Sequence, residues 1–238
     1  MCMNAGKLYL IPVPLAEGAE KSSYTFLHQE IIDRIHEYVV ENEKTARRFL
    51  KSAGLKIPQN QLIIHDYGKH ARGQMNYGEV FANVLKGKDI GLMSEAGCPG
   101  VADPGADVVL EAHKRGIKVV PLVGPSSILL ALMASGFNGQ RFTFHGYLPI
   151  DKGERAKRIK DLESQSAREK VTQIFIETPF RNNQLLNELL RICKPSTLLS
   201  ISSNLTAPDE RIKTMSVAEW KKNPHELHKI PAIFLLFV

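Results

Sequence analysis

Along the first half of the chain, segments with the hydrophobic periodicity of strands take turns with segments that have the periodicity of helices. Segments with the pattern of strands are separated by segments whose apolar residues recur at helical spacing. The expected strands are residues 7–13, 38–40, 61–66, 89–93 and 117–123. The expected helices are residues 27–35, 44–50, 80–85 and 108–112. Strands that alternate with helices indicate βαβ units and therefore a mainly parallel sheet.

The pattern restarts at Arg141, after a joint near residues 121–127, and continues with a different order of elements. Strands are expected at 142–147, 171–177, 198–202, 211–215 and 231–238. Helices are expected at 128–134, 153–165, 185–190 and 218–222. The last strands follow one another with little helix between them, which favours a mixed sheet. The sequence thus predicts two α/β domains, residues 1–122 and 123–238.

Composition narrows the class of protein. The 238 residues are 43% hydrophobic, and no apolar run reaches the roughly 20 residues that a membrane span needs. No basic and then apolar leader opens the chain, so a cytoplasmic protein with no membrane partner is expected. Cys2, Cys98 and Cys193 are too few for a disulfide framework and too far apart for a metal pair. No metal site is therefore predicted.

The net charge of +6 is compatible with a polyanionic partner. Basic residues gather in two expected helices, at Lys44, Arg47, Arg48 and Lys51 and at Lys152, Arg155, Lys157, Arg158 and Lys160. Acidic residues are interleaved with both groups, so a solvated helix face is an equally simple interpretation.

Several common active-site motifs are missing from the sequence. It contains no GxGxxG after the first strand and no GxxxxGK[ST], which argues against the usual dinucleotide fold and a P-loop NTPase. It also contains no HExxH and no GxSxG, which argues against a zinc peptidase and a serine hydrolase.

The loop at 94–105 is the most informative segment for function. It is rich in Gly and Pro, follows the strand at 89–93 and leads into a helix. Ligands of parallel α/β sheets bind beyond the carboxyl ends of the strands, where glycine lets the main chain approach closely. Ser126 and Ser127 open the next helix, either as a cap or as a source of free N–H groups. Further loops at 177–181 and 203–207 complete the expected rim of the site.

Four segments carry a resemblance to a known family. GLMSEAGCPGVADPG at 91–105 resembles a strand followed by SDAGTPxxxDPG, and GIKVVPLVGPSS at 116–127 resembles GIxVVPLPGPxA. RFTFHGYLP at 141–149 resembles RFxxxGFLP, and ENEKTARRFL at 41–50 is a looser match to AEDTRxTxxLL. The chain is thereby similar to the tetrapyrrole methylase superfamily of S-adenosylmethionine-dependent methyltransferases, and most to its branch of ribosomal small-subunit RNA 2′-O-methyltransferases. Residues 12–20 and 230–232 depart from the pattern of that branch.

The resemblance implies S-adenosylmethionine as cofactor, in a cleft between two α/β domains. The residues that it would place at the cofactor are Ser94, Glu95, Ala96, Gly97, Val101, Ser126, Ser127, Asn204, Leu205, Pro231 and Ala232. It also implies that the methyl acceptor is RNA, with ribosomal RNA as the expected kind, and that the protein is a homodimer. An acceptor hydroxyl would need a proton acceptor, for which Glu41, Glu43, Asp103 and Glu177 are unranked candidates. The alternatives are a methyltransferase for small tetrapyrrole-type molecules and a non-catalytic protein that binds the cofactor or RNA.

Overall fold

The computed structural model describes residues 5–68, 75–223 and 225–238. The chain divides into two compact units, Met1–Ser126 and Ser127–Val238. Each unit has its own sheet and its own hydrophobic core. Within the described ranges, no helix is both long and apolar enough to cross a membrane.

The N-terminal unit is built on a five-stranded sheet in the order β3-β2-β4-β1-β5. Every neighbouring pair of strands is parallel, which confirms the predicted sheet. The strands are β1 (Lys7–Leu10), β2 (Glu37–Val40), β3 (Ile63–Asp66), β4 (Ile90–Met93) and β5 (Lys118–Pro121). Because β4 and β1 occupy the middle of the sheet, the loops that follow them leave its carboxyl edge side by side.

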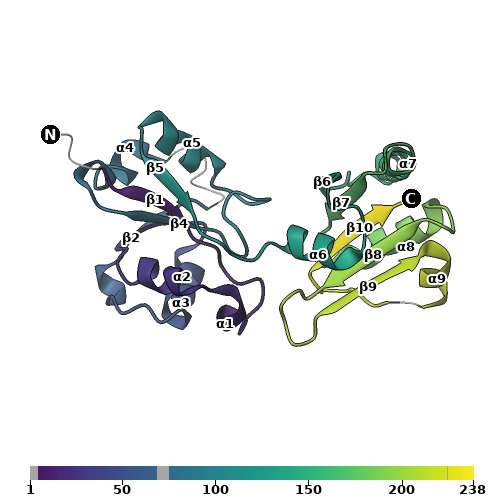
Figure 1. The fold of residues 1–238 in the computed structure, drawn as a ribbon, viewed down its shortest axis with the longest axis horizontal. Coiled ribbons are helices and arrows are strands. Elements are labelled where there is room, and N and C mark those ends of the chain that lie inside the picture. The colour runs from purple at the N-terminus through teal and green to yellow at the C-terminus, as the bar shows by residue number, and fades with distance from the viewer. Residues whose placement is uncertain (1–4, 69–74, 224) are drawn as a thin grey trace. The chain divides into compact units, whose positions relative to one another are not determined.

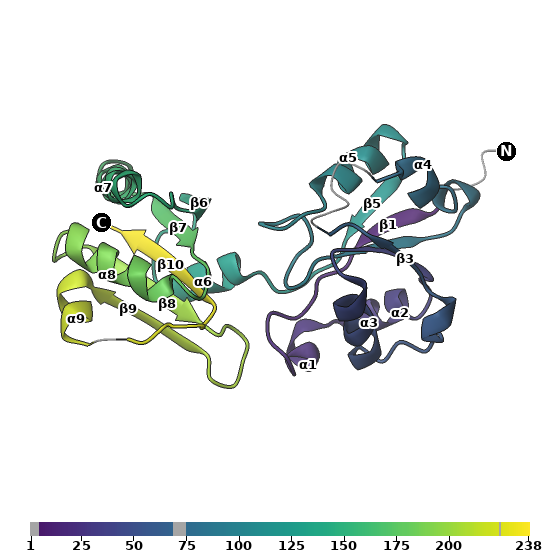
Figure 2. The same ribbon diagram turned by 180° about the vertical axis from the view of Figure 1, so that it is seen from behind.

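Helices cover both faces of this sheet, as Figures 1 and 2 show. They are α1 (Glu20–Ser23), α2 (Phe26–Ile32), α3 (Glu43–Ser52), α4 (Tyr77–Val80) and α5 (Ala106–Lys114). The apolar residues of α2 and α3 pack into one buried cluster with the sheet, and those of α4 and α5 pack into another. Burial on both faces accounts for the continuous apolar runs of the strands.

The helix expected at 80–85 is broken in the structure. It splits into α4 and a short 3-10 helix, Val84–Lys86, after which Gly87 adopts a left-handed φ of 93°. Of the three residues whose spacing marked this helix, Val80 and Val84 are buried, but Leu85 is 46% exposed, so the prediction of its buried face was only partly correct. Beyond the break, the Asn83 amide donates to the Glu37 carboxylate at 3.0 Å, and the Asn83 carbonyl accepts from the N–H groups of Lys86 and Lys88.

The C-terminal unit has a mixed sheet, as predicted, and its strand order is β6-β7-β10-β8-β9. Only β6 and β7 are parallel to each other, and the other pairs are antiparallel. The strands are β6 (Phe142–Tyr147), β7 (Thr172–Ile176), β8 (Leu198–Ser203), β9 (Arg211–Ser216) and β10 (Ala232–Phe237). The carboxyl ends of β6, β7 and β8 and the amino ends of β9 and β10 therefore share one edge, here called the loop edge.

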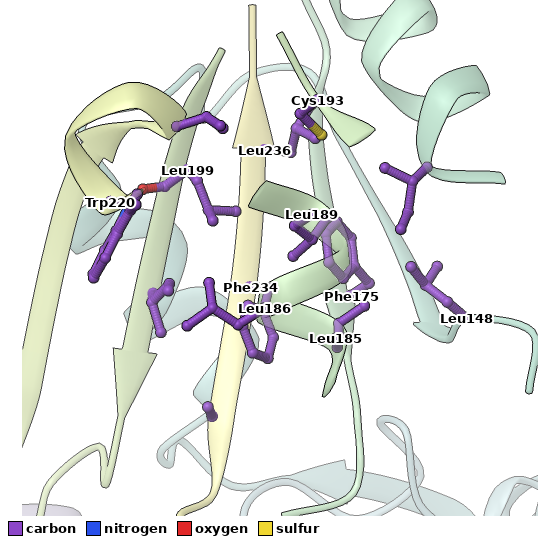
Figure 3. Packing of buried hydrophobic residues seen from close by; sticks show 14 of the residues in the cluster. Leu148, Phe175, Leu185, Leu186, Leu189, Cys193, Leu199, Trp220, Phe234 and Leu236 are labelled. Carbon is purple, nitrogen blue, oxygen red and sulfur yellow. The ribbon is translucent and has the colours of Figure 1, made fainter. Parts of the chain in front are cut away.

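Three helices fill one face of the C-terminal sheet, α7 (Lys152–Glu169), α8 (Asn182–Ile192) and α9 (Val217–Lys222). Their apolar side chains meet Phe175, Leu199 and Phe234 in a single buried cluster (Figure 3). The indole of Trp220 is 2% exposed and donates to the Leu199 carbonyl at 2.8 Å. The remaining helix, α6 (Ser127–Ser135), packs on the opposite face against β8, β9 and β10.

Candidate functional site

The carboxyl edge of the N-terminal sheet is held together by a bridge between the loops after β1 and β4. Val13 N–H donates to the Gly97 carbonyl at 2.9 Å, and Gly97 N–H donates to the Val13 carbonyl at 2.8 Å. The segment with Pro12 and Pro14 is thereby fixed beside the Gly/Pro-rich loop. The sequence indicated the loop at 94–105, whereas it predicted a strand through Val13; β1 ends at Leu10, and the pairing of the two loops depends on the order of β1 and β4 in the sheet.

Gly97 is required at this bridge by its backbone conformation. Its φ is +74°, in the left-handed region where side chains with a β-carbon are strained. A β-carbon there would also lie 3.3 Å from Leu15 Cδ2 and 3.5 Å from the Pro125 carbonyl oxygen. A bulky residue at this position would therefore disturb the loop itself, in addition to anything bound beside it.

A third loop, after β5, joins the same edge. The Cys98 thiol donates to the Pro125 carbonyl at 3.2 Å, and burial raises the pKa of that thiol. A β-carbon at Gly124 would lie only 2.2 Å from Pro12 Cβ, so glycine allows the loops after β5 and β1 to touch. Three of the five strands thus deliver their loops to one compact surface.

A cavity of about 240 Å³ opens between the β1 loop, α3 and the β4 loop. Its walls combine apolar and polar groups, including Leu15, Phe49, Arg48, Thr45, Ser94 and Glu95. The predicted residues Ser94, Glu95 and Ala96 all line it. Asn42 begins α3 by accepting from the main-chain N–H groups of Lys44 and Thr45, and this cap directs the first turn of the helix at the cavity.

Ser94 and Glu95 are two of the polar residues that line the cavity. Ser94 is 7% exposed, and no group in the described part of the chain forms a hydrogen bond with its Oγ. Glu95 is exposed, and its carboxylate accepts from the Thr45 hydroxyl while its main-chain N–H donates to Glu41 Oε1 at 3.2 Å. These two residues therefore present a hydroxyl with no partner among the described residues and a carboxylate, and Glu17 and Glu20 line the cavity as well.

Arg48 is the basic residue of α3 that reaches this cavity. Its neighbour Arg47 is instead held by structure, because it forms an ion pair with Glu43 at 2.7 Å and donates to the Gln59 carbonyl. Helical spacing predicted Arg47 and Arg48 on one helix, and only the tertiary contacts show which of the two reaches the cavity.

Four predicted residues of the C-terminal unit meet at its loop edge. Asn204 N–H donates to the Pro231 carbonyl at 3.1 Å, and Ala232 pairs with the residue before Asn204. Leu205 is 8% exposed. Asn204 and Thr206 have left-handed φ values of +47° and +70°, and strain of this kind in a β-branched residue gathers at ligand sites. The hydroxyl of Thr206 is buried without a partner among the described residues, and no feature of the local sequence indicated it.

The other predicted residues are less concentrated. Val101 is 48% exposed and does not line the cavity. Ser126 and Ser127 are half-buried and flank the boundary between the units. Of the carboxylates considered as proton acceptors, Glu41 lies beside the cavity through its bond to Glu95 N–H, and Asp103 lies half-buried in the loop at 94–105. The other two are engaged in ion pairs, Glu43 with Arg47 and Glu177 with Arg181 at 2.7 Å.

The basic cluster on α7 is only partly a solvated face. Lys152, Lys157 and Lys160 are exposed, but Arg155 is 2% exposed. It forms a two-pronged ion pair with Glu188, at 2.6 and 2.7 Å, so it holds α7 to α8. The expectation of an exposed arginine is wrong at this position because its partner lies on another helix, where periodicity gives no signal.

No group of three or more His, Cys, Asp or Glu side chains among the described residues is arranged to hold a metal ion.

Comparisons with known proteins agree on one family. The profile of the family "Tetrapyrrole (Corrin/Porphyrin) Methylases" matches residues 39–221. A Vibrio cholerae protein named "Ribosomal RNA small subunit methyltransferase I" is 29% identical over 212 residues, which cover 89% of this chain and 69% of the relative. The protein of the same name in Escherichia coli O157:H7 is 27% identical, with coverage of 95% and 76%. The crystal structure of the methyltransferase CobJ is 17% identical, with a TM-score of 0.62 over 98% of this chain and 94% of that one, and it supports the fold.

Proposed function

The chain belongs to the tetrapyrrole methylase family, and on that premise we propose that it is an S-adenosylmethionine-dependent methyltransferase of small-subunit ribosomal RNA that methylates a ribose 2′-hydroxyl. Membership confirms the resemblance read from the motifs and the class of enzyme expected from it. The observation that carries the choice of acceptor is the shared name of relatives that cover most of the chain.

The cavity of the N-terminal unit has donors and acceptors that suit this cofactor. S-adenosylmethionine carries an ammonium group, a carboxylate and ribose hydroxyls. The Glu95 carboxylate can accept from the ammonium or a hydroxyl, and the unpartnered Ser94 Oγ can bind either a donor or an acceptor. Apolar walls such as Leu15 and Phe49 exclude water from the less polar parts of the ligand. The residues present therefore fit the cofactor.

Main-chain geometry supports the other proposed cofactor residues. Gly97 and Ala96 would present main chain to the ligand, as the left-handed φ of Gly97 allows. In the C-terminal unit, Asn204, Leu205, Pro231 and Ala232 lie together around a strained turn, which supports a ligand contact at the loop edge.

When bound, the cofactor supplies a methyl group on a positively charged sulfur, which becomes a neutral thioether as the methyl moves to the acceptor oxygen. The protein has to align the acceptor, exclude water and receive the hydroxyl proton. Alignment alone can provide about 7–11 kcal/mol of the barrier in well-oriented reactions. Glu41, Glu43, Asp103 and Glu177 stay candidates for the proton acceptor, and Glu41 lies beside the cavity through its bond from Glu95 N–H.

An RNA acceptor is also supported by exposed positive charge. Arg48 at the cavity and Lys157 on α7 are exposed, whereas Arg47 and Arg158 donate to neighbouring groups of the protein. We therefore expect Arg48 and Lys157 to contribute most to phosphate binding, since phosphate contacts supply most of the affinity for nucleic acid.

We further propose a homodimer. Helix α6 buries Ile128, Ala131 and Leu132 but leaves Leu129 and Met133 exposed by 51% and 79%. These two residues are four apart and so share one side of the helix. Light scattering that gives a monomer across micromolar concentrations would remove this part of the proposal.

The deciding experiment supplies purified protein with methyl-labelled S-adenosylmethionine and small ribosomal subunits, followed by mass-spectrometric mapping of the RNA. One labelled 2′-O-methyl nucleotide is expected, and the same nucleotide should be unmethylated in a strain that lacks the protein. A protein that binds the cofactor but leaves the RNA map unchanged would refute the RNA acceptor and favour a small-molecule acceptor.

A further inference from the structure

The loop edge of the C-terminal unit contains a rigid turn, residues 177–181, that holds an aromatic ring in solvent. Phe180 is 69% exposed. The turn is closed by Arg181 N–H, which donates to the Thr178 carbonyl at 2.8 Å. Beneath it, the buried carboxylate of Glu177 accepts from Thr178 N–H at 2.6 Å and from the Arg181 guanidinium at 2.7 Å. The main chain that carries Phe180 is thus fixed from inside.

A second segment fixes the same turn from the side. Lys229 N–H donates to the Pro179 carbonyl at 3.0 Å. Asn182, which is fully buried, donates from its amide to the Ile230 carbonyl at 2.6 Å. The ring of Phe180 is therefore presented by a backbone that has already been ordered, and a ligand that stacks on it loses little additional conformational entropy.

Positive charge lies against this ring. The Lys229 ammonium is 6.0 Å from the Phe180 ring centroid, within the range of a cation–π contact. The His228 ring meets Phe180 edge-on, with centroids 6.1 Å apart. Among the ion pairs formed by the described residues, none involves Lys229, so its charge is available to an anion. Its left-handed φ of +61° places it beside the ring at some cost in strain.

The neighbouring loop extends the exposed surface. Strand β6 runs parallel to β7, and Tyr147 pairs with Ile176, so the loops after both strands leave the same edge. Tyr147 and Ile150 are 60% and 73% exposed. The buried Arg155 guanidinium donates to the Ile150 carbonyl at 3.2 Å and thereby fixes this loop as well.

We propose that Phe180, with Lys229 beside it, is a platform on which an unpaired base of the RNA substrate stacks while the ammonium binds an adjacent phosphate. The inference rests on the proposed RNA acceptor and adds where and how that RNA is held. A paired A-form helix offers its phosphates and groove edges, whereas an unpaired base offers a free ring face. An exposed aromatic ring next to an unpaired cation matches the second kind of ligand, because stacking and phosphate charge are satisfied together.

The test measures binding of a fluorescein-labelled, unstructured RNA of about twelve nucleotides by fluorescence anisotropy. Phe180→Ala should weaken binding about tenfold, which corresponds to about 1.4 kcal/mol and lies within the range for one stacked base. Phe180→Trp should restore it. The matched control is Phe26→Ala, because Phe26 is 93% exposed but lies on α2 of the other unit. For a duplex of the same sequence, the dissociation constants of wild type and Phe180→Ala should differ by less than twofold.

Salt dependence separates the stacking contact from the ionic one. Lys229→Gln should reduce the slope of log affinity against log salt by about 0.7, the value for one phosphate contact on a single strand. Phe180→Ala should lower affinity at every salt concentration and leave that slope unchanged. A Phe180→Ala variant that changes the slope as Lys229→Gln does would overturn the assignment of stacking to the ring.

The outcomes also separate this inference from the proposed function. If wild-type protein methylates ribosomal RNA and Phe180→Ala binds the twelve-nucleotide RNA as wild type does, the platform is overturned and the function stands. If Phe180→Ala instead abolishes self-association in sedimentation and leaves RNA binding unchanged, the surface joins two copies of the chain and the platform is again overturned. If wild type neither binds nor methylates RNA, the proposed function is overturned, and the platform with it.

Discussion

Replacing Ser94 by alanine tests the cofactor site in a way that separates binding from folding. The Ser94 side chain is buried, and its hydroxyl has no hydrogen-bond partner in the described part of the chain. A buried hydroxyl of this kind costs about 1–3 kcal/mol of stability when nothing satisfies it. The Ser94→Ala variant therefore loses no internal hydrogen bond, and its free energy of unfolding should stay unchanged or rise by about 1 kcal/mol.

Cofactor affinity should change in the opposite direction. One hydrogen bond contributes about 0.5–1.5 kcal/mol net, so S-adenosylmethionine should bind Ser94→Ala about 2- to 10-fold more weakly. Isothermal titration calorimetry gives the affinity, and thermal unfolding followed by circular dichroism gives the stability. The cofactor should accordingly raise the melting temperature of the variant by less than it raises that of wild type at the same concentration.

Ser135→Ala is the matched control, because Ser135 is buried to a similar degree but its hydroxyl is satisfied. It donates to the Leu132 carbonyl at 2.8 Å and accepts from Phe137 N–H at 3.0 Å. This variant should lose about 1 kcal/mol of stability and keep its cofactor affinity. The reasoning is refuted if Ser94→Ala behaves like Ser135→Ala, since the Ser94 hydroxyl would then be satisfied within the protein.

Three further results are expected in the C-terminal unit. Glu188→Ala leaves the Arg155 guanidinium buried without its carboxylate and should lower the free energy of unfolding by about 3–5 kcal/mol. Urea unfolding followed by the fluorescence of Trp220, the single tryptophan, measures this loss, and a loss below about 1 kcal/mol would contradict a buried ion pair. Hydrogen bonds from Arg155 hold the pKa of Glu188 below its usual range, so this stabilisation is present above the pKa of an unfolded glutamate and is lost as pH falls through the folded pKa. As pH is lowered below about 4, the melting temperature should accordingly fall, and it should fall less steeply in Glu188→Gln than in wild type. Equal slopes of melting temperature against pH in the two proteins would show that the Glu188 carboxyl does not cause the fall. Burial raises the pKa of the Cys193 thiol to about 12, so iodoacetamide at pH 8 should label it only after unfolding. Mass spectrometry that finds labelled Cys193 in the native protein would contradict this prediction.

Local sequence was sufficient for most of the secondary structure of both units. Apolar runs bounded by glycine located the strands of the parallel sheet, because strands buried on both faces need continuous apolar residues. Where the prediction failed, at residues 80–85, α4 ends at Val80 and a 3-10 helix follows at Val84–Lys86, with the Asn83 amide bonded to Glu37 in a distant strand. Periodicity placed Val80 and Val84 in the core but was wrong for Leu85, and it could not foresee a contact with a distant strand.

For the candidate site too, sequence and tertiary structure decided different features. The sequence by itself determined the loop at 94–105, because only a Gly/Pro-rich segment between a strand and a helix lets main chain approach a ligand, and its motifs identified the family. Only the tertiary structure paired Gly97 with Val13 and left the Ser94 hydroxyl without a partner among the residues that the structure describes. Tertiary structure also decided that Arg155 is buried while Phe180 is exposed, because burial of one side chain depends on elements far away in the chain. Strand order and helix packing bring those elements together, and neither is encoded in the spacing of nearby residues.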